Sequence, residues 1–174
     1  MTDAPTPSHR RLGTGMLILA WVVGLALAAY WFSGVEDRQQ NPNQKPDSVH
    51  RDNAVEVRLE PNRQGHFLVD GQINRHTVTF LVDTGASFVA VPADLAEKMG
   101  LEQGRGFMVE TANGTAPGFS TRLHSLRIGD IELHDVEAGI VPGMGGEDVL
   151  LGMSALRQLD FSSQGGDLLL RQYQ

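Results

Sequence analysis

The sequence predicts an all-β domain with one or two short helices, preceded by an N-terminal transmembrane helix. Three observations predict this fold class. From Ala54 onward, short segments of alternating apolar and polar residues are separated by turn-forming residues. The chain holds 20 glycines and 8 prolines with 6% aromatic residues, a composition typical of a β protein with many tight turns. Residues 12–32 contain no charged side chain.

The uncharged run is long enough to cross a bilayer. At about 1.5 Å per residue, a helix over residues 12–32 spans about 30 Å, the thickness of the hydrocarbon core. An aromatic cluster, Tyr30-Trp31-Phe32, lies at its far end, where an interfacial belt is expected. Arg10 and Arg11 precede the run. The positive-inside rule therefore predicts a cytoplasmic tail over residues 1–11, a signal anchor in the inner membrane, and export of the remaining chain to the periplasmic or extracytoplasmic side.

Two other interpretations of this run are open. A helix in the core of a soluble domain usually presents one polar face, whereas this run is uncharged on every face. A cleaved signal peptide is the stronger alternative, because Ala26-Leu27-Ala28 has the small-x-small pattern of a cleavage site. The apolar run continues past that site through the aromatic cluster, which favours an uncleaved anchor.

Composition limits the rest of the chain. The formal net charge is -7, which gives no electrostatic support for nucleic-acid binding, and no cysteine is present for disulfides or thiolate metal sites. Residues 33–52 hold almost nothing apolar, so we expect a flexible linker there. The folded domain is then expected over residues 53–174.

The domain begins with three predicted strands. Val55, Val57 and Leu59 alternate with charged residues, and a turn over 61–65 follows. A second strand around Val69 is expected to end in a tight turn at Asp70-Gly71, and a third runs over 73–82, with Asn74-Arg75 as another candidate turn.

The remaining elements follow the same logic. We expect a short apolar strand over 88–91, a helix opened by Pro92 and stopped by Gly100, and a hairpin turning at Asn113-Gly114. Two strands over 123–128 and 131–141 lead into a glycine-rich loop. The last elements are an apolar strand over 149–152, a helix over 154–159 capped by Ser154, and a strand over 168–170.

The chemically informative stretch is Phe80-Leu81-Val82-Asp83-Thr84-Gly85-Ala86-Ser87. An apolar strand ends in an aspartate, and a glycine then frees the backbone to turn. A carboxylate on a rigid, partly buried strand end is a candidate acid or base. Asp-Thr-Gly also forms ordinary turns, so the motif needs its context.

That context resembles the retropepsins, the single-lobe aspartic proteases, and more closely their bacterial membrane-anchored relatives. Three features match in order: Asp83-Thr84-Gly85-Ala86 after an apolar strand, a Thr-Ala-Asn-Gly hairpin over 111–114, and Leu150-Leu151-Gly152 before a short helix and a final strand. The resemblance implies a closed β-barrel-like lobe.

The resemblance also implies an aspartic endopeptidase without a cofactor. A pair of Asp83 carboxylates, one from each chain of a homodimer, would activate the water, because this chain holds a single Asp-Thr-Gly. Thr84 would lock the two motif loops together, and Gly85 and Ala86 would face the peptide substrate. The hairpin tip, made of Thr111, Ala112, Asn113 and Gly114, would close over it.

Two rival functions stay open. A non-catalytic peptide-binding or dimerisation module would keep the fold but would not need the Asp83 carboxylate. A metal site would use some of the six histidines, yet no pair of them has tight ligand spacing with a nearby carboxylate motif such as His-Glu-x-x-His.

Overall fold

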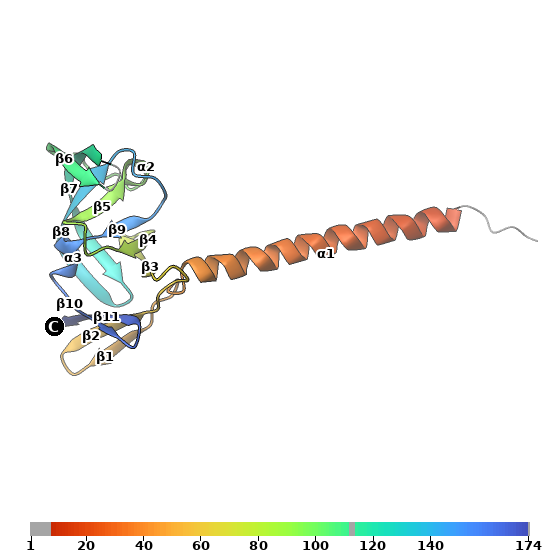
Figure 1. The fold of residues 1–174 in the computed structure, drawn as a ribbon, viewed down its shortest axis with the longest axis horizontal. Coiled ribbons are helices and arrows are strands. Elements are labelled where there is room, and N and C mark those ends of the chain that lie inside the picture. Colours follow the sequence, from red (N-terminus) through yellow and green to blue (C-terminus); the bar gives the residue numbers. More distant parts are fainter. Residues whose placement is uncertain (1–7, 112–113, 174) are drawn as a thin grey trace, which may run out of the picture. The chain divides into compact units, whose positions relative to one another are not determined.

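The computed structural model describes residues 8–111 and 114–173. The chain forms two compact units, Met1–Arg38 and Gln39–Gln174. The first contains a single helix, and the second is built from strands with two short helices (Figure 1). The predicted fold class is therefore confirmed.

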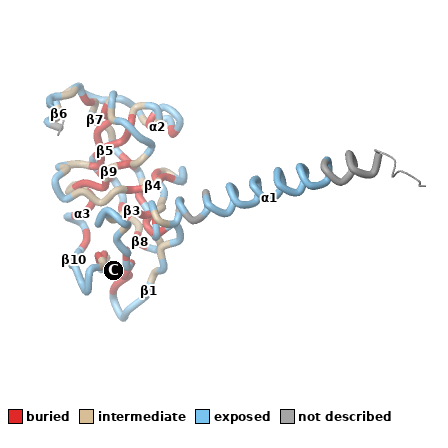
Figure 2. Tube along the Cα trace, turned by 45° about the vertical axis from the view of Figure 1, so that its right-hand side comes forward, coloured by how far each residue is buried: buried red, intermediate tan, exposed pale blue. Residues whose placement is uncertain are grey.

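Helix α1 covers Ser8–Gln40, so it extends beyond the expected 12–32 at both ends. Its window Gly15–Phe32 has a mean hydropathy of 2.0, and none of that window is buried. Figure 2 shows the residues of this window as exposed throughout. In the part of the chain that the structure describes, this is the one helix long and apolar enough to cross a membrane.

The β unit is organised around a sheet that closes on itself. Its strand order is β3-β4-β9-β5-β8-β7-β6, and β3 also pairs with β7 through Gln72 opposite Arg127 and Ile73 opposite Leu126. The closure makes a barrel with one projecting hairpin, β6–β7. The strands are β3 (Leu68–Ile73), β4 (His76–Val82), β5 (Val89–Pro92), β6 (Gly106–Thr111), β7 (Gly114–Ile128), β8 (Ile131–Val141) and β9 (Val149–Leu151).

A second sheet lies at the end of the β unit opposite the β6–β7 hairpin (Figure 1). Its order is β1-β2-β11-β10, all antiparallel. The sequence patterns indicated only two of these strands, because β1 is short and polar and β10 is exposed throughout. The bounds are β1 (Ser48–Arg51), β2 (Ala54–Leu59), β10 (Asp160–Gln164) and β11 (Asp167–Tyr173).

One buried carboxylate ties this sheet together. Glu56 on β2 is 7% exposed and contacts Arg171 at 2.6 Å and Arg51 at 3.1 Å. The hydrogen bonds from Arg171, and then from Arg51, hold the pKa of Glu56 below its ordinary value. Because this pKa is lowered in the folded state, the ion pairs of Glu56 stabilise the fold at pH values above the ordinary pKa of a glutamate. Their contribution to the free energy of unfolding is lost as the pH falls through the lowered pKa.

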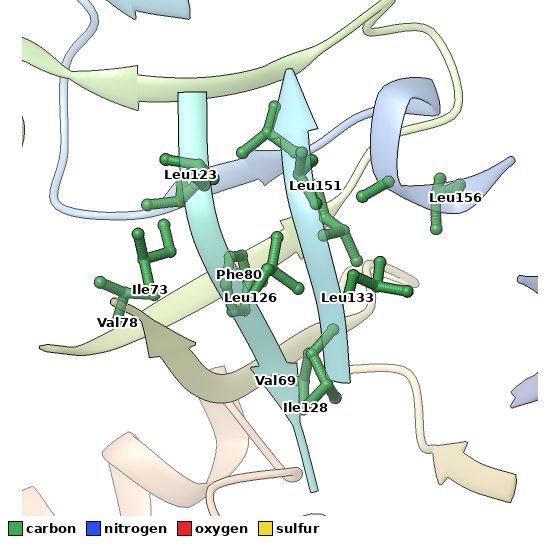
Figure 3. Packing of buried hydrophobic residues seen from close by; sticks show 14 of the residues in the cluster. Val69, Ile73, Val78, Phe80, Leu123, Leu126, Ile128, Leu133, Leu151 and Leu156 are labelled. Carbon is green, nitrogen blue, oxygen red and sulfur yellow. The ribbon is translucent and has the colours of Figure 1, made fainter. Parts of the chain in front are cut away.

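The core fills the barrel. Phe80, on β4, is fully buried among side chains from β3, β7 and β9, as Figure 3 shows for Ile73, Leu126 and Leu151. Strands β4 and β9 run parallel side by side, with Phe80 opposite Val149 and Val82 opposite Leu151. In β4 the buried Val78 and Phe80 alternate with less buried neighbours, whereas the short strand β9 is apolar throughout.

The predicted tight turn at Asp70-Gly71 is wrong. Both residues lie inside β3, and the chain turns at Asn74 and Arg75, which have φ of 48° and 73°. Gly71 is needed for space: a Cβ there would overlap the carbonyl of Arg127 and lie 2.8 Å from the Phe80 ring. A glycine in a strand can mark such a close approach as well as a turn.

The segment expected to be a flexible linker, 33–52, holds the end of α1, an asparagine-rich stretch and β1. The Asn43 side-chain amide donates to the carbonyls of Glu60 (2.9 Å) and Leu68 (2.7 Å), and its oxygen accepts from the Glu60 N–H (2.8 Å). Asn41 donates to Asp70 at 2.7 Å. Asparagine amides can replace backbone partners, so a polar segment binds the sheet here without apolar burial.

Replacing Asn43 with alanine is therefore expected to destabilise the β unit. The substitution removes three hydrogen bonds at a site that is 6% exposed, a loss of about 3 kcal/mol and about 8 °C in the melting temperature. Thermal unfolding of the full chain in detergent measures the change. Gln44→Ala, at the exposed neighbour, is the control. An equal melting temperature for both variants would support the linker interpretation instead.

Candidate active site

Asp83 is placed by the parallel pair β4 and β9. It follows Val82 directly, and its backbone N–H donates to the carbonyl of Leu151 at 3.2 Å. The residue is half-buried, whereas the strand before it runs into the core. Asp83 thus lies at a partly buried strand end, as the sequence predicted.

The turn after Asp83 holds the carboxylate. The Gly85 N–H donates to Asp83 Oδ1 at 2.8 Å, and the Ala86 N–H donates to the Asp83 carbonyl at 3.2 Å. A Cβ on Gly85 would lie 3.1 Å from Asp83 Oδ1, so glycine lets the backbone approach the acid. Thr84 is exposed on the same turn.

Helix α3 (Met153–Leu156) supports this turn from the other side. The Met153 N–H donates to the Ala86 carbonyl at 2.8 Å. A Cβ on Gly152 would overlap the carbonyl oxygen of Phe88 and lie 2.8 Å from that of Ala86. Glycine at 152 therefore permits direct backbone contact between β9–α3 and the turn.

The predicted cap at Ser154 is wrong. The N-cap position of α3 is Gly152, without a side-chain cap. The Ser154 hydroxyl accepts from the Val89 N–H at 3.0 Å and donates to the Glu137 carbonyl at 2.7 Å. It joins α3 to β5 and β8, a role that depends on tertiary neighbours. Helix α2 (Ala93–Lys98), in contrast, begins directly after Pro92, as expected.

Asp83 lines a cleft of about 930 Å³. The floor is the turn of Asp83, Gly85 and Ala86, and one wall is the β6–β7 hairpin, which includes Val109 and Gly114. Ala112 and Asn113, expected at the hairpin tip, lie outside the described residues. Thr111 pairs with Gly114 at the ends of β6 and β7, and Gly114 has φ 108°.

Sequence reasoning missed the other walls of the cleft. They include Phe88, Phe107 and Leu150, together with residues 141–145 at the end of β8 and in the loop after it. The apolar character of Phe88, Phe107 and Leu150 was visible in the sequence, but it was equally compatible with a place in the hydrophobic core. Only the pairing of distant strands brings them round the carboxylate.

Asp148 lies beyond this loop, directly before β9. Burial, and then the nearby charges of Asp70 and Glu147, raise the pKa of Asp148. Asp148 does not line the cleft of Asp83. Among the described residues, no group of three or more histidine, aspartate or glutamate side chains could hold a metal ion.

Comparison with known proteins agrees with this geometry. A family model described as "gag-polyprotein putative aspartyl protease" matches residues 69–158. Uncharacterized proteins of a Sinorhizobium species and of Rickettsia prowazekii are 34% and 32% identical over 66% and 68% of this chain. The chain spans about half the length of these curated relatives, 50% and 52%.

A solved structure has a similar fold. The crystal structure of a retropepsin-like aspartic protease from Rickettsia conorii superposes with a TM-score of 0.57 at 28% identity, covering 74% of this chain and 96% of that one. The matched family segment contains the Asp83 turn, the hairpin and α3.

Proposed function

The chain belongs to this family of retropepsin-like aspartyl proteases, and we propose that it is an aspartic endopeptidase whose active site forms between two copies. One observation carries the proposal. Asp83 lies at a strand end, oriented by the Gly85 N–H, on the floor of a 930 Å³ cleft walled by a hairpin. A cleft of this form accommodates an extended peptide.

The chemistry requires a second carboxyl group. Two neighbouring carboxyls share one proton, so the ionised one accepts a proton from water while the neutral one polarises the peptide carbonyl. The chain has one Asp-Thr-Gly. We therefore assign the second carboxyl to Asp83 of another copy, which places the active site on a two-fold axis.

The neighbouring residues receive supporting roles in this proposal. Thr84, exposed on the turn, would contact the same turn of the second copy. Gly85 and Ala86 would present backbone to the peptide, since both line the cleft. The tip of the hairpin, residues 111–114, would close over the bound peptide and exclude water.

We further propose that α1 anchors the enzyme in the inner membrane. Its apolar window follows Arg10 and Arg11 and precedes Glu36, which favours a cytoplasmic N-terminus and a β unit on the periplasmic side. Confinement to one membrane plane would raise the effective concentration of chains for pairing.

Pairing makes activity depend on protein concentration. We expect the cleavage rate per chain of the detergent-solubilised full chain to fall on dilution, approaching proportionality to concentration once monomers dominate. Adding excess Asp83→Asn chain should suppress the remaining activity by forming mixed pairs. The readout is cleavage of a diverse peptide mixture over a hundredfold dilution series.

The alternative is a pair of carboxyls within one chain. Glu110 on β6 also lines the cleft and is the candidate for such a pair. In that case the rate per chain would stay constant on dilution, and inactive chain would not interfere. That result would overturn the shared active site.

A further inference from the structure

Two aromatic rings meet at one end of the cleft. Phe88 follows the Asp83 turn, and Phe107 lies on β6 of the hairpin. Their ring centroids are 5.3 Å apart and their planes are inclined at 84°. This edge-to-face arrangement is a favourable geometry for an aromatic pair. It links the floor of the cleft to its wall.

The sheet beneath the rings leaves room for them. A Cβ on Gly139 of β8 would lie 2.5 Å from Phe88 and 3.0 Å from Phe107. A Cβ on Gly118 of β7, which pairs with Phe107, would lie 3.2 Å from the Phe107 ring. The two glycines thus form a flat base on which the rings rest, and the rings have no space to move toward the sheet.

The pair also separates two hollows. Phe88 and Phe107 line the 930 Å³ cleft of Asp83, and both also line a second hollow of about 680 Å³. The second hollow is otherwise walled by residues that do not reach the cleft, among them Gly104, Ser120 and Glu137. The aromatic pair is therefore the partition between the two spaces.

We propose that the Phe88–Phe107 partition is the end wall of an apolar side-chain pocket and sets the largest substrate side chain that the cleft accepts. The inference rests on the proposed function as a peptide-binding protease. Apolar side chains short enough to stop at the partition gain contact with both rings. Longer or bulkier side chains meet the two rings, which cannot retreat toward the sheet because the glycine base lies directly beneath them.

Removing one ring should connect the hollows. In Phe107→Ala, a bulky side chain such as that of tryptophan can extend through the former partition, whereas small apolar side chains lose their contact. A difference of a few methylene groups in a pocket changes selection strongly, so we expect the ratio of large to small side chains at one substrate position to rise about tenfold.

The control is Val109→Ala on the same strand. Val109 lines the cleft but not the second hollow, so its truncation enlarges the cleft without opening the partition. The experiment digests a diverse peptide mixture with the full chain in detergent and identifies the residues flanking each cleaved bond by mass spectrometry. Phe107→Leu, which keeps an apolar side chain, provides a milder change if the alanine variant does not fold.

A binding readout separates this inference from the proposed function. The same mixture is passed over immobilised Asp83→Asn protein with and without each substitution, and the retained peptides are identified. If the wild-type chain cleaves nothing, the proposed protease activity fails, yet the retained peptides still report the pocket. A shift toward larger side chains at one substrate position in Phe107→Ala, with no such shift in Val109→Ala, supports the partition. If the side-chain preference of Phe107→Ala is unchanged, or if Val109→Ala shows the same shift, the partition proposal is overturned.

Discussion

Replacing Asp83 with asparagine is expected to abolish peptide cleavage, with a fall in kcat of at least about a thousandfold. Asparagine has nearly the same shape, and its side-chain oxygen can still accept the Gly85 N–H that now bonds Asp83 Oδ1 at 2.8 Å. The amide, however, cannot ionise to accept a proton from water. The fold should persist, so the melting temperature should change little. Cleavage of a diverse peptide mixture between about pH 3 and pH 8 brackets carboxyl titration and measures the loss.

Asp148→Asn is the matched control for this substitution. Asp148 is also half-buried and also close to a strand of the barrel, but it does not line the cleft. We expect it to retain cleavage. If Asp83→Asn cleaves as well as the wild type, the carboxylate is not catalytic. If neither the wild type nor the variant cleaves while both retain peptides, the chain is a binding module on a protease fold.

Replacing Gly152 with alanine is expected to cause a large loss of both stability and activity. The added Cβ would overlap the Phe88 carbonyl and lie 2.8 Å from the Ala86 carbonyl. Both obstacles are backbone atoms of the segment that follows Asp83, so no flexible side chain can move aside. Overpacking of this kind costs about 3 kcal/mol, or about 8 °C in the melting temperature. The displaced turn should also reduce cleavage. Thermal unfolding and peptide cleavage of the full chain measure the two effects.

Gly145→Ala is the appropriate comparison. Gly145 lines the same cleft, but a Cβ there would meet nothing within 4 Å. This variant should keep its melting temperature within about 1 °C of the wild type, as expected for substitutions without contacts. Equal stability of the two variants would show that β9–α3 and the Asp83 turn can separate without cost.

Local chemistry explains what could be predicted from the sequence. The apolar run ending in Asp83-Thr84-Gly85 indicated a strand and a turn because alternation and glycine act over a few residues. Pro92 at the start of α2 acted in the same local way. The all-β class and the position of the aspartate at a strand end therefore followed from patterns that need no distant partner, whereas the closed barrel was implied by the family resemblance.

The errors arose where a residue's role depends on what lies across the barrel. Gly71 looked like a turn glycine but makes room for Phe80. Asn43 looked like part of a solvated linker but binds the backbone of β3. Ser154 looked like a helix cap but joins three elements. In each case the side chain is compatible with two environments, and only the fold selects one.

The sequence by itself determined the apolar N-terminal segment, the β class of the domain and the catalytic candidate, since each depends on residue type and spacing along the chain. The tertiary structure decided which residues surround Asp83. It brought Phe88 and Phe107 together over Gly118 and Gly139, between the cleft lined by Asp83 and a second hollow. Such a wall depends on side chains from strands far apart in the sequence, and their contact is a property of packing that no local pattern encodes.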